Sequence, residues 1–491
     1  MKRLLRRIVF YAAAFLLIAL VLFLVLDLTA GRWLPPLKPW HELTLENEFH
    51  AELDDGSFSW KQWQELEGRL FDELERLKPE LAQAAGFEES RFKPGGNHYA
   101  RRLERDWNRS FVLEPEKPRA VALLIHGLSD SPYSLHSLAL SLQRAGVIVY
   151  GLRLPGHGTL PGELDDVRWQ DWLAAVRVAT RHIEAAHGDL PFWIVGYSMG
   201  AALGVKHTLD TLLRGEGATP EGLFLISPAL GVSPLARLAN LQRIFSRIPY
   251  FRRSRWLSIV PEYDPFKYLS FTKNAGRQMS LLISEIYDDL DRLKAEGREK
   301  ELPPILGFQS VVDETVSTLD LVDRLYGIID DHRSELVLFD INRLSFYQAF
   351  TKFSPDAVIA ALRALGHKSF PITVITNVSE SSPAVAEFTW MRADEEPRVR
   401  GLALDWPEDI YSLSHVALPF PPDDPVYGYL ERDHDGRPVK TLGNLAVRGE
   451  RNVLQVPAGE LLRLRANPFY DYIERRILSR VTREEEVGRG R

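Results

Sequence analysis

The feature that most constrains the fold is an alternation of short apolar runs and helical stretches that begins near residue 120. The runs are "AVALLIHG", "VIVYGLRL", "FWIVGYS", "GLFLISP", "PILGFQS" and "ELVLFDI". Uninterrupted apolar runs of this length are typical of strands that are buried on both faces. The alternation therefore predicts an α/β fold, in which helices cover both faces of a mostly parallel sheet.

Two long interruptions break this alternation, and we interpret both as insertions. Residues 230–301 separate the fourth run from the fifth, and residues 342–410 follow the sixth. The second insertion contains the strand-like segments "FPITVITNV" and "AVAEFTWMRA", for which the sequence alone gives no place in the sheet.

Amphipathic segments are expected on either side of the first four runs. The stretch "WKQWQELEGRLFDELERL", residues 60–77, has helical periodicity and predicts a helix packed on the domain. The first insertion has six arginines between Arg237 and Arg255 without an acidic residue, and its apolar residues at helical spacing are Leu238, Leu241, Phe245 and Ile248. It predicts a helical cap that either covers a substrate pocket or rests as a lid on anionic lipid.

The N-terminus predicts a single membrane anchor. Residues 8–26, "IVFYAAAFLLIALVLFLVL", contain no charged residue, and at about 1.5 Å per residue such a helix spans a hydrocarbon layer of about 30 Å. The basic residues before it are Lys2, Arg3, Arg6 and Arg7, which by the positive-inside rule keep the N-terminus in the cytoplasm. The remaining chain would then lie outside the cytoplasm, which means the periplasm if the source is a Gram-negative bacterium. The alternative is a cleaved signal peptide, but its apolar core is usually only about 7–15 residues long.

Composition excludes several classes of function. A formal net charge of −7 and the lack of a lysine-rich block argue against a nucleic-acid partner. The chain contains no cysteine, which excludes disulfide bonds, thiolate metal sites and a cysteine nucleophile. No glycine-rich loop for a dinucleotide or phosphate is apparent, and we expect neither a cofactor nor a metal.

Ser198 in "VGYSMGAALG" is the candidate nucleophile. It follows an apolar run and precedes a helical stretch, and in a sharp strand-to-helix turn Gly196 and Gly200 would avoid a collision of Cβ atoms. The alternative is a serine that lies between two glycines by chance. The N–H groups of Met199 and of Leu128, which follows "LLIHG", are the expected donors to an oxyanion. His126 in the same segment is expected to be structural.

The chain resembles the α/β-hydrolase superfamily, in particular its monoacylglycerol-lipase-like and serine-aminopeptidase-like branch. The resemblance lies in "HGLSDSP", "LRLPGHGTLPGE" and "VGYSMGAALG", and it extends over residues 120–341 and 411–428. It implies the α/β-hydrolase fold and a catalytic triad in the chain order serine, acid, histidine. For the acid, "PPILGFQSVVDETVS" places Asp313 just beyond a strand, with Glu314 as the adjacent alternative.

His415 in "YSLSHVALPF" is the expected base of this triad. The other candidates, His332, His367 and His434, lie in polar or helix-terminal segments that are typical of a solvated surface. Simple members of the superfamily place the histidine one helix and one strand after the acid. His415 is much farther along the chain, so it meets Asp313 only if residues 342–410 form an excursion that returns to the same edge of the sheet.

Together, these features predict a membrane-anchored serine hydrolase that cleaves carboxylic esters, such as those of acyl glycerols or other lipids. One alternative is an aminopeptidase or amidase, in which Glu262 or Asp264 of "PEYDP" would hold the substrate amine; another is a non-catalytic binding domain. The expected organisation is an anchor (1–26), a helical extension (27–117), a first core part (118–229), the cap (230–301), the core with the acid (302–341), the second insertion (342–410), and the histidine loop with the C-terminal segment (411–491).

Overall fold

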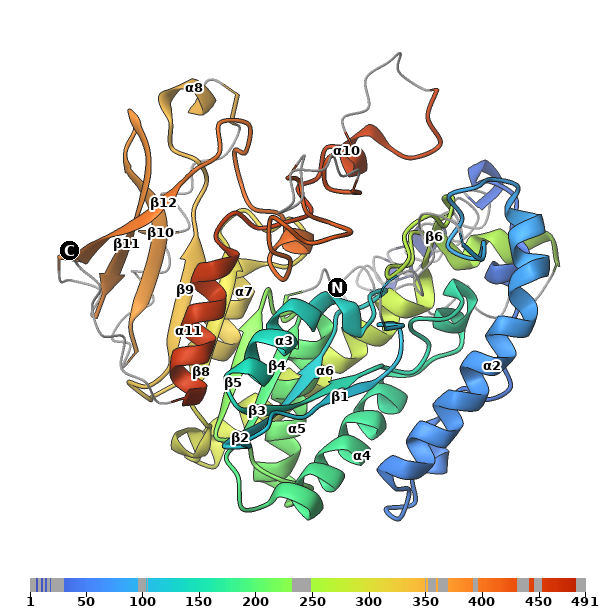
Figure 1. Cartoon of the computed structure of the whole chain (residues 1–491), viewed down its shortest axis with the longest axis horizontal. Coiled ribbons are helices and arrows are strands. Elements are labelled where there is room, and N and C mark those ends of the chain that lie inside the picture. The colour runs from blue at the N-terminus through green and yellow to red at the C-terminus, as the bar shows by residue number, and fades with distance from the viewer. Residues whose placement is uncertain are drawn as a thin grey trace.

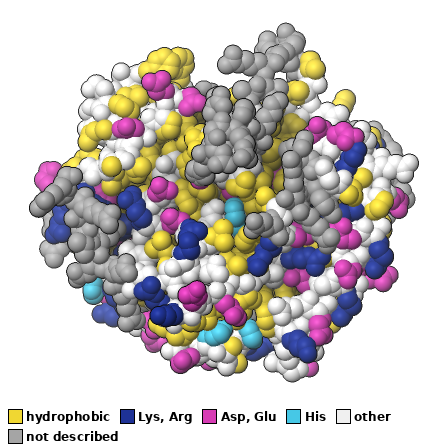
Figure 2. All heavy atoms as spheres, viewed as in Figure 1, with side chains coloured by type: hydrophobic (Ala, Val, Ile, Leu, Met, Phe, Trp, Pro, Cys, Tyr) yellow, Lys and Arg dark blue, Asp and Glu magenta, His cyan; other side chains and the backbone are white. Residues whose placement is uncertain are grey.

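The computed structural model describes residues 31–95, 105–231, 249–348, 370–391, 396–430, 441–445 and 453–482, with isolated positions elsewhere. A large twisted sheet runs through the molecule, and helices lie on both of its sides (Figure 1). Charged side chains of both signs are interspersed over the face seen in Figure 2.

Within these residues the sheet has ten strands in the order β1-β3-β2-β4-β5-β8-β9-β10-β11-β12. The neighbours from β3 to β10 pair in parallel, whereas β1, β11 and β12 pair antiparallel at the two edges. The bounds are β1 (Phe111–Leu113), β2 (Ala120–Ile125), β3 (Val147–Leu152), β4 (Phe192–Tyr197), β5 (Gly222–Ile226), β8 (Ile305–Ser310), β9 (Glu335–Phe339), β10 (Ile372–Ser379), β11 (Ser382–Trp390) and β12 (Arg398–Asp405). Each of the six predicted apolar runs forms a strand, so the prediction of a mostly parallel sheet is confirmed.

The central strands are apolar throughout because they are buried on both faces. In β2, Val121 and Leu123 pack into one hydrophobic cluster, and Ala122 and Leu124 pack into another on the opposite side. The first cluster includes side chains of α4 (Trp169–His187), α5 (Met199–Arg214) and α6 (Lys273–Ala295). The second includes side chains of α3 (His136–Arg144) and α11 (Tyr470–Thr482). Because a hydrophobic core lies on each face of the sheet, both odd and even positions of the strands are hydrophobic.

The strands of the predicted second insertion extend this same sheet. β10 pairs in parallel with β9, and the hairpin β11–β12 continues the sheet outward. The chain then returns to the carboxyl ends of the central strands, where Asn342 N–H donates to Tyr411 O at 2.8 Å and Ser310 Oγ donates to Leu413 O at 2.9 Å. These two bonds bring the segment before His415 back to the end of β8.

The described part of the predicted cap insertion divides into two. Residues 249–272 form η9 (Pro249–Arg255), the short hairpin of β6 (Trp256–Ser258) and β7 (Phe271–Thr272), and the loop between these strands. The following helix, α6, packs on α5, and its Asp289 pairs with Lys206 and Arg214 of that helix. This helix therefore belongs to the layer beside the sheet. Leu238, Leu241, Phe245 and Ile248 lie outside the described residues.

The N-terminal extension is held to the core by a long helix, α2 (Trp60–Ala85). Ser59 caps its start with a hydrogen bond from Gln62 N–H, and Gly86, at φ 76°, ends it. This confirms the helix predicted over residues 60–77 and extends it to Ala85. Its buried face consists of Trp60, Trp63, Glu67, Leu70, Phe71, Leu74, Lys78 and Leu81.

A buried ion cluster joins this extension to the loop after β3. The Arg153 guanidinium donates to both carboxylate oxygens of Glu48, at 3.0 and 2.9 Å, and to Glu67 at 2.9 Å. Its side chain is 1% exposed. Gly156 N–H also donates to Glu48, so this carboxylate holds the Leu-Pro-Gly-His-Gly loop in place.

Among the residues that the structure describes, none of the helices has the length and apolar character needed to cross a bilayer. The predicted anchor, residues 8–26, lies outside the described residues apart from Phe10, Tyr11, Ala14, Phe15 and Ile18.

Candidate active site

Ser198 lies on a sharp turn between β4 and α5. Its backbone has φ 53° and ψ −114°, a conformation that L-residues rarely adopt. The turn requires glycine on both sides: a Cβ on Gly196 would lie 2.3 Å from Ala201 Cα, and one on Gly200 would lie 2.0 Å from Ile125 O. The sequence pattern therefore has a steric cause, and the strained turn places the serine at the carboxyl end of a central strand.

The chain brings Ser198, Asp313 and His415 together. His415 Nε2 lies 2.9 Å from Ser198 Oγ, and His415 Nδ1 lies 2.7 Å from Asp313 Oδ2. All three side chains are largely buried; as whole residues, Ser198 is 8% exposed and His415 is 4% exposed. The adjacent Glu314 is exposed, as is His332, whereas His367 and His434 lie outside the described residues.

Four hydrogen bonds fix the Asp313 carboxylate. Oδ2 accepts from His415 and from Gln309 Nε2 at 2.9 Å, and Oδ1 accepts from the N–H groups of Thr315 and Val316 at 2.8 and 3.0 Å. Burial disfavours the charged carboxylate, but the charge and hydrogen bond of His415, together with the two backbone donors, outweigh it. The pKa of Asp313 therefore lies below its usual range, and the group is ionised at neutral pH.

The two expected oxyanion donors lie next to Ser198. Met199 is the first residue of α5, where a helix leaves its N–H groups without intrahelical partners. On the other side, a Cβ on Gly127 would be 3.2 Å from Ser198 Cβ, so the segment that carries Leu128 is in contact with the serine. Neither N–H donates a hydrogen bond to another described residue.

His126 has a structural position, as the sequence suggested. The His126 ring is fully buried, and its Nε2 accepts from Leu154 N–H at 3.0 Å while Nδ1 donates to Gly127 O at 2.8 Å. Burial lowers the pKa of His126 well below its usual range, so the ring is neutral. It links the loop after β2 to the loop after β3.

Comparisons with known proteins match the same part of the chain. The family "Serine aminopeptidase, S33" matches residues 116–291. A thermostable monoacylglycerol lipase from Bacillus sp. (strain H-257) is 34% identical over 86 residues, which are 16% of this chain and 32% of that lipase. A monoglyceride lipase from Rattus norvegicus is 29% identical over 121 residues, 24% of this chain and 37% of the relative. The chain thus spans about a third of the length of the curated relatives it matches.

A solved monoacylglycerol lipase structure, from Paleococcus ferrophilus, has 17% sequence identity and a TM-score of 0.35, and the match covers 52% of this chain and 98% of the lipase. The family matches residues 116–291. The order of the strands and the strained turn at Ser198 are consistent with this match. The chain has an α/β-hydrolase fold, and in its matched part it is similar to monoacylglycerol lipases.

An ion pair that the sequence did not reveal joins the segment beside Ser198 to the loop between β6 and β7. Asp130, which follows the Leu128 segment, lies 3.1 Å from Lys267 Nζ in the loop between β6 and β7. In the same loop, Tyr268 N–H donates to Ser129 O at 2.8 Å. Asp130 is buried, and a Cβ on Gly127 would lie 3.0 Å from its Oδ2. No local pattern pairs residues so distant in sequence, which is why only the structure reveals this brace.

The acidic residues considered as anchors for a substrate amine are already engaged in this α/β-hydrolase. Glu262 accepts hydrogen bonds from Leu269 N–H and Ser270 N–H, and it is completely buried. Asp264 accepts from Tyr427 Oη and from two backbone N–H groups of its own loop, and Arg465 approaches it to 3.7 Å. Both carboxylates stabilise the loop between β6 and β7.

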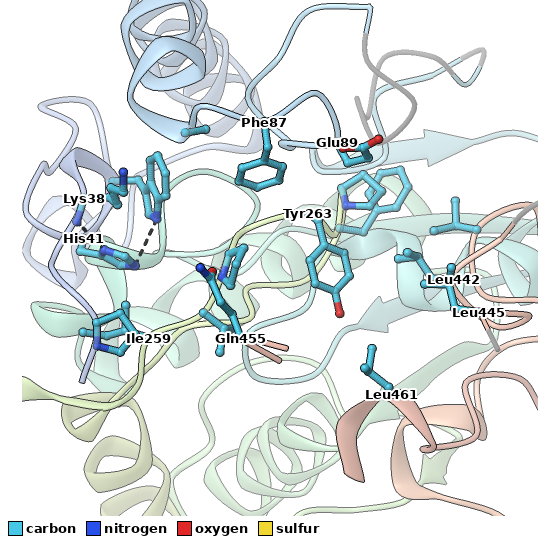
Figure 3. A pocket seen from close by; sticks show the side chains of 18 of the residues that line it. Lys38, His41, Phe87, Glu89, Ile259, Tyr263, Leu442, Leu445, Gln455 and Leu461 are labelled. Carbon is cyan, nitrogen blue, oxygen red and sulfur yellow. Dashed lines mark hydrogen bonds between the residues drawn. The ribbon is translucent and has the colours of Figure 1, made fainter. Parts of the chain in front are cut away.

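A cavity of about 1300 Å³ lies beside this loop (Figure 3). One wall comes from the N-terminal extension, another from residues 259–266, and a third from the segment after His415. Ser198 itself is not among the lining residues, which are Pro35, Pro36, Lys38, Trp40, His41, Ala85, Phe87, Glu89, Leu103, Ile259, Val260, Pro261, Tyr263, Pro265, Phe266, Pro425, Val426, Thr441, Leu442, Leu445, Gln455 and Leu461.

Proposed function

We propose that this α/β-hydrolase is a serine hydrolase that cleaves carboxylic esters of acyl glycerols or similar lipids. The observation that carries the proposal is the pair of hydrogen-bond distances that links Ser198 to His415 and His415 to Asp313. The names of the relatives, monoacylglycerol lipase and monoglyceride lipase, support the substrate class.

In the proposed reaction, Ser198 Oγ attacks the acyl carbonyl while His415 Nε2 takes the serine proton. Asp313 accepts the hydrogen bond from His415 Nδ1–H, which selects the tautomer with a free Nε2 and stabilises the imidazolium that forms. The N–H groups of Leu128 and Met199 donate to the oxyanion. His415 then protonates the leaving alcohol, and water activated by the same histidine releases the acyl group.

The first test is hydrolysis of p-nitrophenyl esters, from acetate to palmitate, by the full chain and its variants. We expect Ser198→Ala or His415→Ala to lower kcat by about 10⁶-fold and Asp313→Asn by about 10⁴-fold. Ser227→Ala is the matched control, because Ser227 follows the neighbouring strand β5 and also has a positive φ, 44°. Ester hydrolysis that survives Ser198→Ala would overturn the assignment of the nucleophile.

An amidase or aminopeptidase activity receives less support. Such an enzyme needs a free carboxylate for the substrate amine, and Glu262 and Asp264 are occupied by backbone and tyrosine donors. Peptide anilides assayed beside the ester series should therefore be poor substrates. If a fluorophosphonate labels Ser198 but the chain hydrolyses no ester, an amidase or aminopeptidase becomes the better hypothesis. If the fluorophosphonate does not label the chain at all, a non-catalytic protein is favoured.

We also propose that residues 8–26 anchor the enzyme in a membrane, with the N-terminus in the cytoplasm and the hydrolase outside it. Besides the uncharged sequence, the support is the exposure of four large apolar side chains in this segment. Phe10, Tyr11, Phe15 and Ile18 are each 67–71% exposed, and no described part of the protein covers them. Large apolar side chains left uncovered in this way favour contact with lipid.

A further inference from the structure

The cavity beside the loop between β6 and β7 is built mainly from parts of the chain outside the matched family segment. That segment, residues 116–291, supplies only the wall formed by residues 259–266. The other walls come from residues 35–89 with Leu103 and from residues 425–461. Figure 3 shows side chains of these walls, such as Phe87, Ile259 and Leu442, around one space. The cavity is therefore a property of this chain rather than of the shared core.

The lining is suited to an apolar ligand. Most lining side chains are proline, aliphatic or aromatic. His41 is buried, and burial together with the charge of Lys38 lowers its pKa to about 3, so the ring is neutral. Its Nδ1 accepts from Lys38 N–H, and the Lys38 ammonium donates to Ala84 O at 2.9 Å. These two side chains thus have hydrogen-bond partners in the protein, and the rest of the lining is mainly apolar, with Glu89, Thr441, Gln455 and the Tyr263 hydroxyl as its other polar groups.

The size of the cavity points to a long ligand. Pockets for small molecules usually have about 300–1000 Å³, and this cavity has about 1300 Å³. A short acyl group such as acetate would leave most of it empty, whereas a long acyl chain would bury its methylenes there. The difference in binding between long and short esters is therefore the property to measure.

Contacts on one short path link this cavity to the candidate nucleophile. Phe266 lines the cavity and stacks on Tyr133, with ring centroids 3.8 Å apart. The next residue, Lys267, pairs with Asp130, whose N–H donates to Gly127 O at 3.2 Å. A Cβ on Gly127 would lie 3.2 Å from Ser198 Cβ. Among the described residues, Lys267, Asp130 and Gly127 thus form one path from the cavity wall to the serine.

We propose that this cavity binds the acyl chain of the ester whose carbonyl reacts at Ser198, and that the N-terminal extension thereby sets a preference for long chains. The inference rests on the proposed ester hydrolysis. It assigns a specificity role to residues 35–89, which lie outside the matched family segment. Ala85 of α2 and Val260 of the loop line the cavity from two different walls.

The test fills the cavity from each wall, with Ala85→Trp and Val260→Trp in the full chain. The measured quantity is the ratio of kcat/KM for p-nitrophenyl palmitate to kcat/KM for p-nitrophenyl acetate. We expect each variant to lower this ratio by about tenfold or more, because a filled pocket rejects extra methylenes. Ala82→Trp is the matched control, since Ala82 lies on the same helix, is also half-buried and does not line the cavity. An unchanged ratio in both filled variants would overturn the inference.

A binding measurement separates this inference from the proposed reaction. In the Ser198→Ala background, cis-parinaric acid should gain fluorescence with the chain, and Ala85→Trp should weaken its affinity by about tenfold while Ala82→Trp leaves it unchanged. In one outcome, the probe binds, Ala85→Trp prevents its binding, and the wild-type chain hydrolyses no ester. The cavity is then a lipid site, and the proposed reaction is wrong. If esters are hydrolysed through Ser198 and Ala85→Trp affects neither the ratio nor the probe, then the cavity assignment fails alone.

Discussion

At the scale of one residue, hydrogen bonds keep the Asp313 carboxylate ionised. Both of its oxygens accept hydrogen bonds, Oδ2 from His415 and Gln309 and Oδ1 from two backbone N–H groups. An asparagine cannot reproduce this arrangement, because its amide NH₂ would face a donor on at least one side. The position therefore requires a carboxylate both for orientation of the imidazole and for local stability.

This environment predicts a pH-dependent contribution to stability. The folded-state pKa of Asp313 lies below its unfolded value of about 3.9, so the carboxylate stabilises the fold above about pH 4. As the pH falls through the folded-state pKa, the contribution is lost. We expect Asp313→Asn to lower the free energy of unfolding at pH 7, and the difference from wild type to shrink progressively below about pH 4 in urea titrations.

Glu314→Gln is the control for this measurement, because Glu314 is the exposed neighbour on the same turn. Its free energy of unfolding should stay within about 0.5 kcal/mol of wild type at each pH. A difference between Asp313→Asn and wild type that persists undiminished at pH 3 would contradict the assigned direction of the pKa shift.

At the scale of elements, the Arg153 ion cluster joins α2, through Glu67, and the N-terminal loop that contains Glu48 to the core. The guanidinium lies between Glu48 and Glu67, and all three side chains are at most 7% exposed. Removing one partner of a buried ion cluster leaves the others charged and unpaired, which costs about 3–5 kcal/mol. We expect Arg153→Met to lower the free energy of unfolding by this amount in urea denaturation.

Two further variants make this prediction specific. Lys61→Met removes one member of an exposed pair on the same α2 helix, with Lys61 and Glu65 4.0 Å apart, and should change stability by less than about 0.5 kcal/mol. A triple variant with Arg153→Met, Glu48→Gln and Glu67→Gln leaves no buried charge unpaired and should recover part of the loss. If the triple variant is less stable than Arg153→Met, unpaired charge is not the cause.

The same scale shows what the sequence could and could not predict. Strands such as β2 were predictable because burial on both faces makes every position apolar. β12 was not, because it is an edge strand whose side chains are mostly exposed or half-buried, so it lacks that signature. The partners of Ser198 were named from family motifs, but their meeting depended on the path of residues 342–410 back to the end of β8. Pairs such as Asp130 with Lys267 leave no local pattern and were found only in the structure.

At the scale of the whole molecule, the α/β core that contains the matched family segment carries additions on several sides. The extension with α2 covers the loop after β3, β10–β12 widen the sheet, and α11 packs on the face opposite α5 (Figure 1). The extension and the C-terminal segment also complete the walls of the cavity. These additions line the cavity with residues that the matched family segment does not contain.

The proposed anchor makes a prediction about the whole chain. When residues 1–491 are expressed in a Gram-negative bacterium, the protein should remain in the membrane pellet after carbonate extraction, whereas residues 27–491 should be released. An intact mass that includes residues 8–26 distinguishes an anchor from a cleaved signal peptide. Release of the full, uncleaved chain by carbonate would contradict the proposal.

Gly31 packs so closely on η9 that an added Cβ would lie 2.8 Å from Ser254 N. The packed part of the chain thus begins five residues beyond Leu26, a distance of at most about 18 Å for extended chain. A proposed anchor with so short a tether would confine the cavity to the bilayer surface. Encounters with lipid would then occur by lateral diffusion in two dimensions, and the rate would follow the mole fraction of substrate in the membrane rather than its bulk concentration.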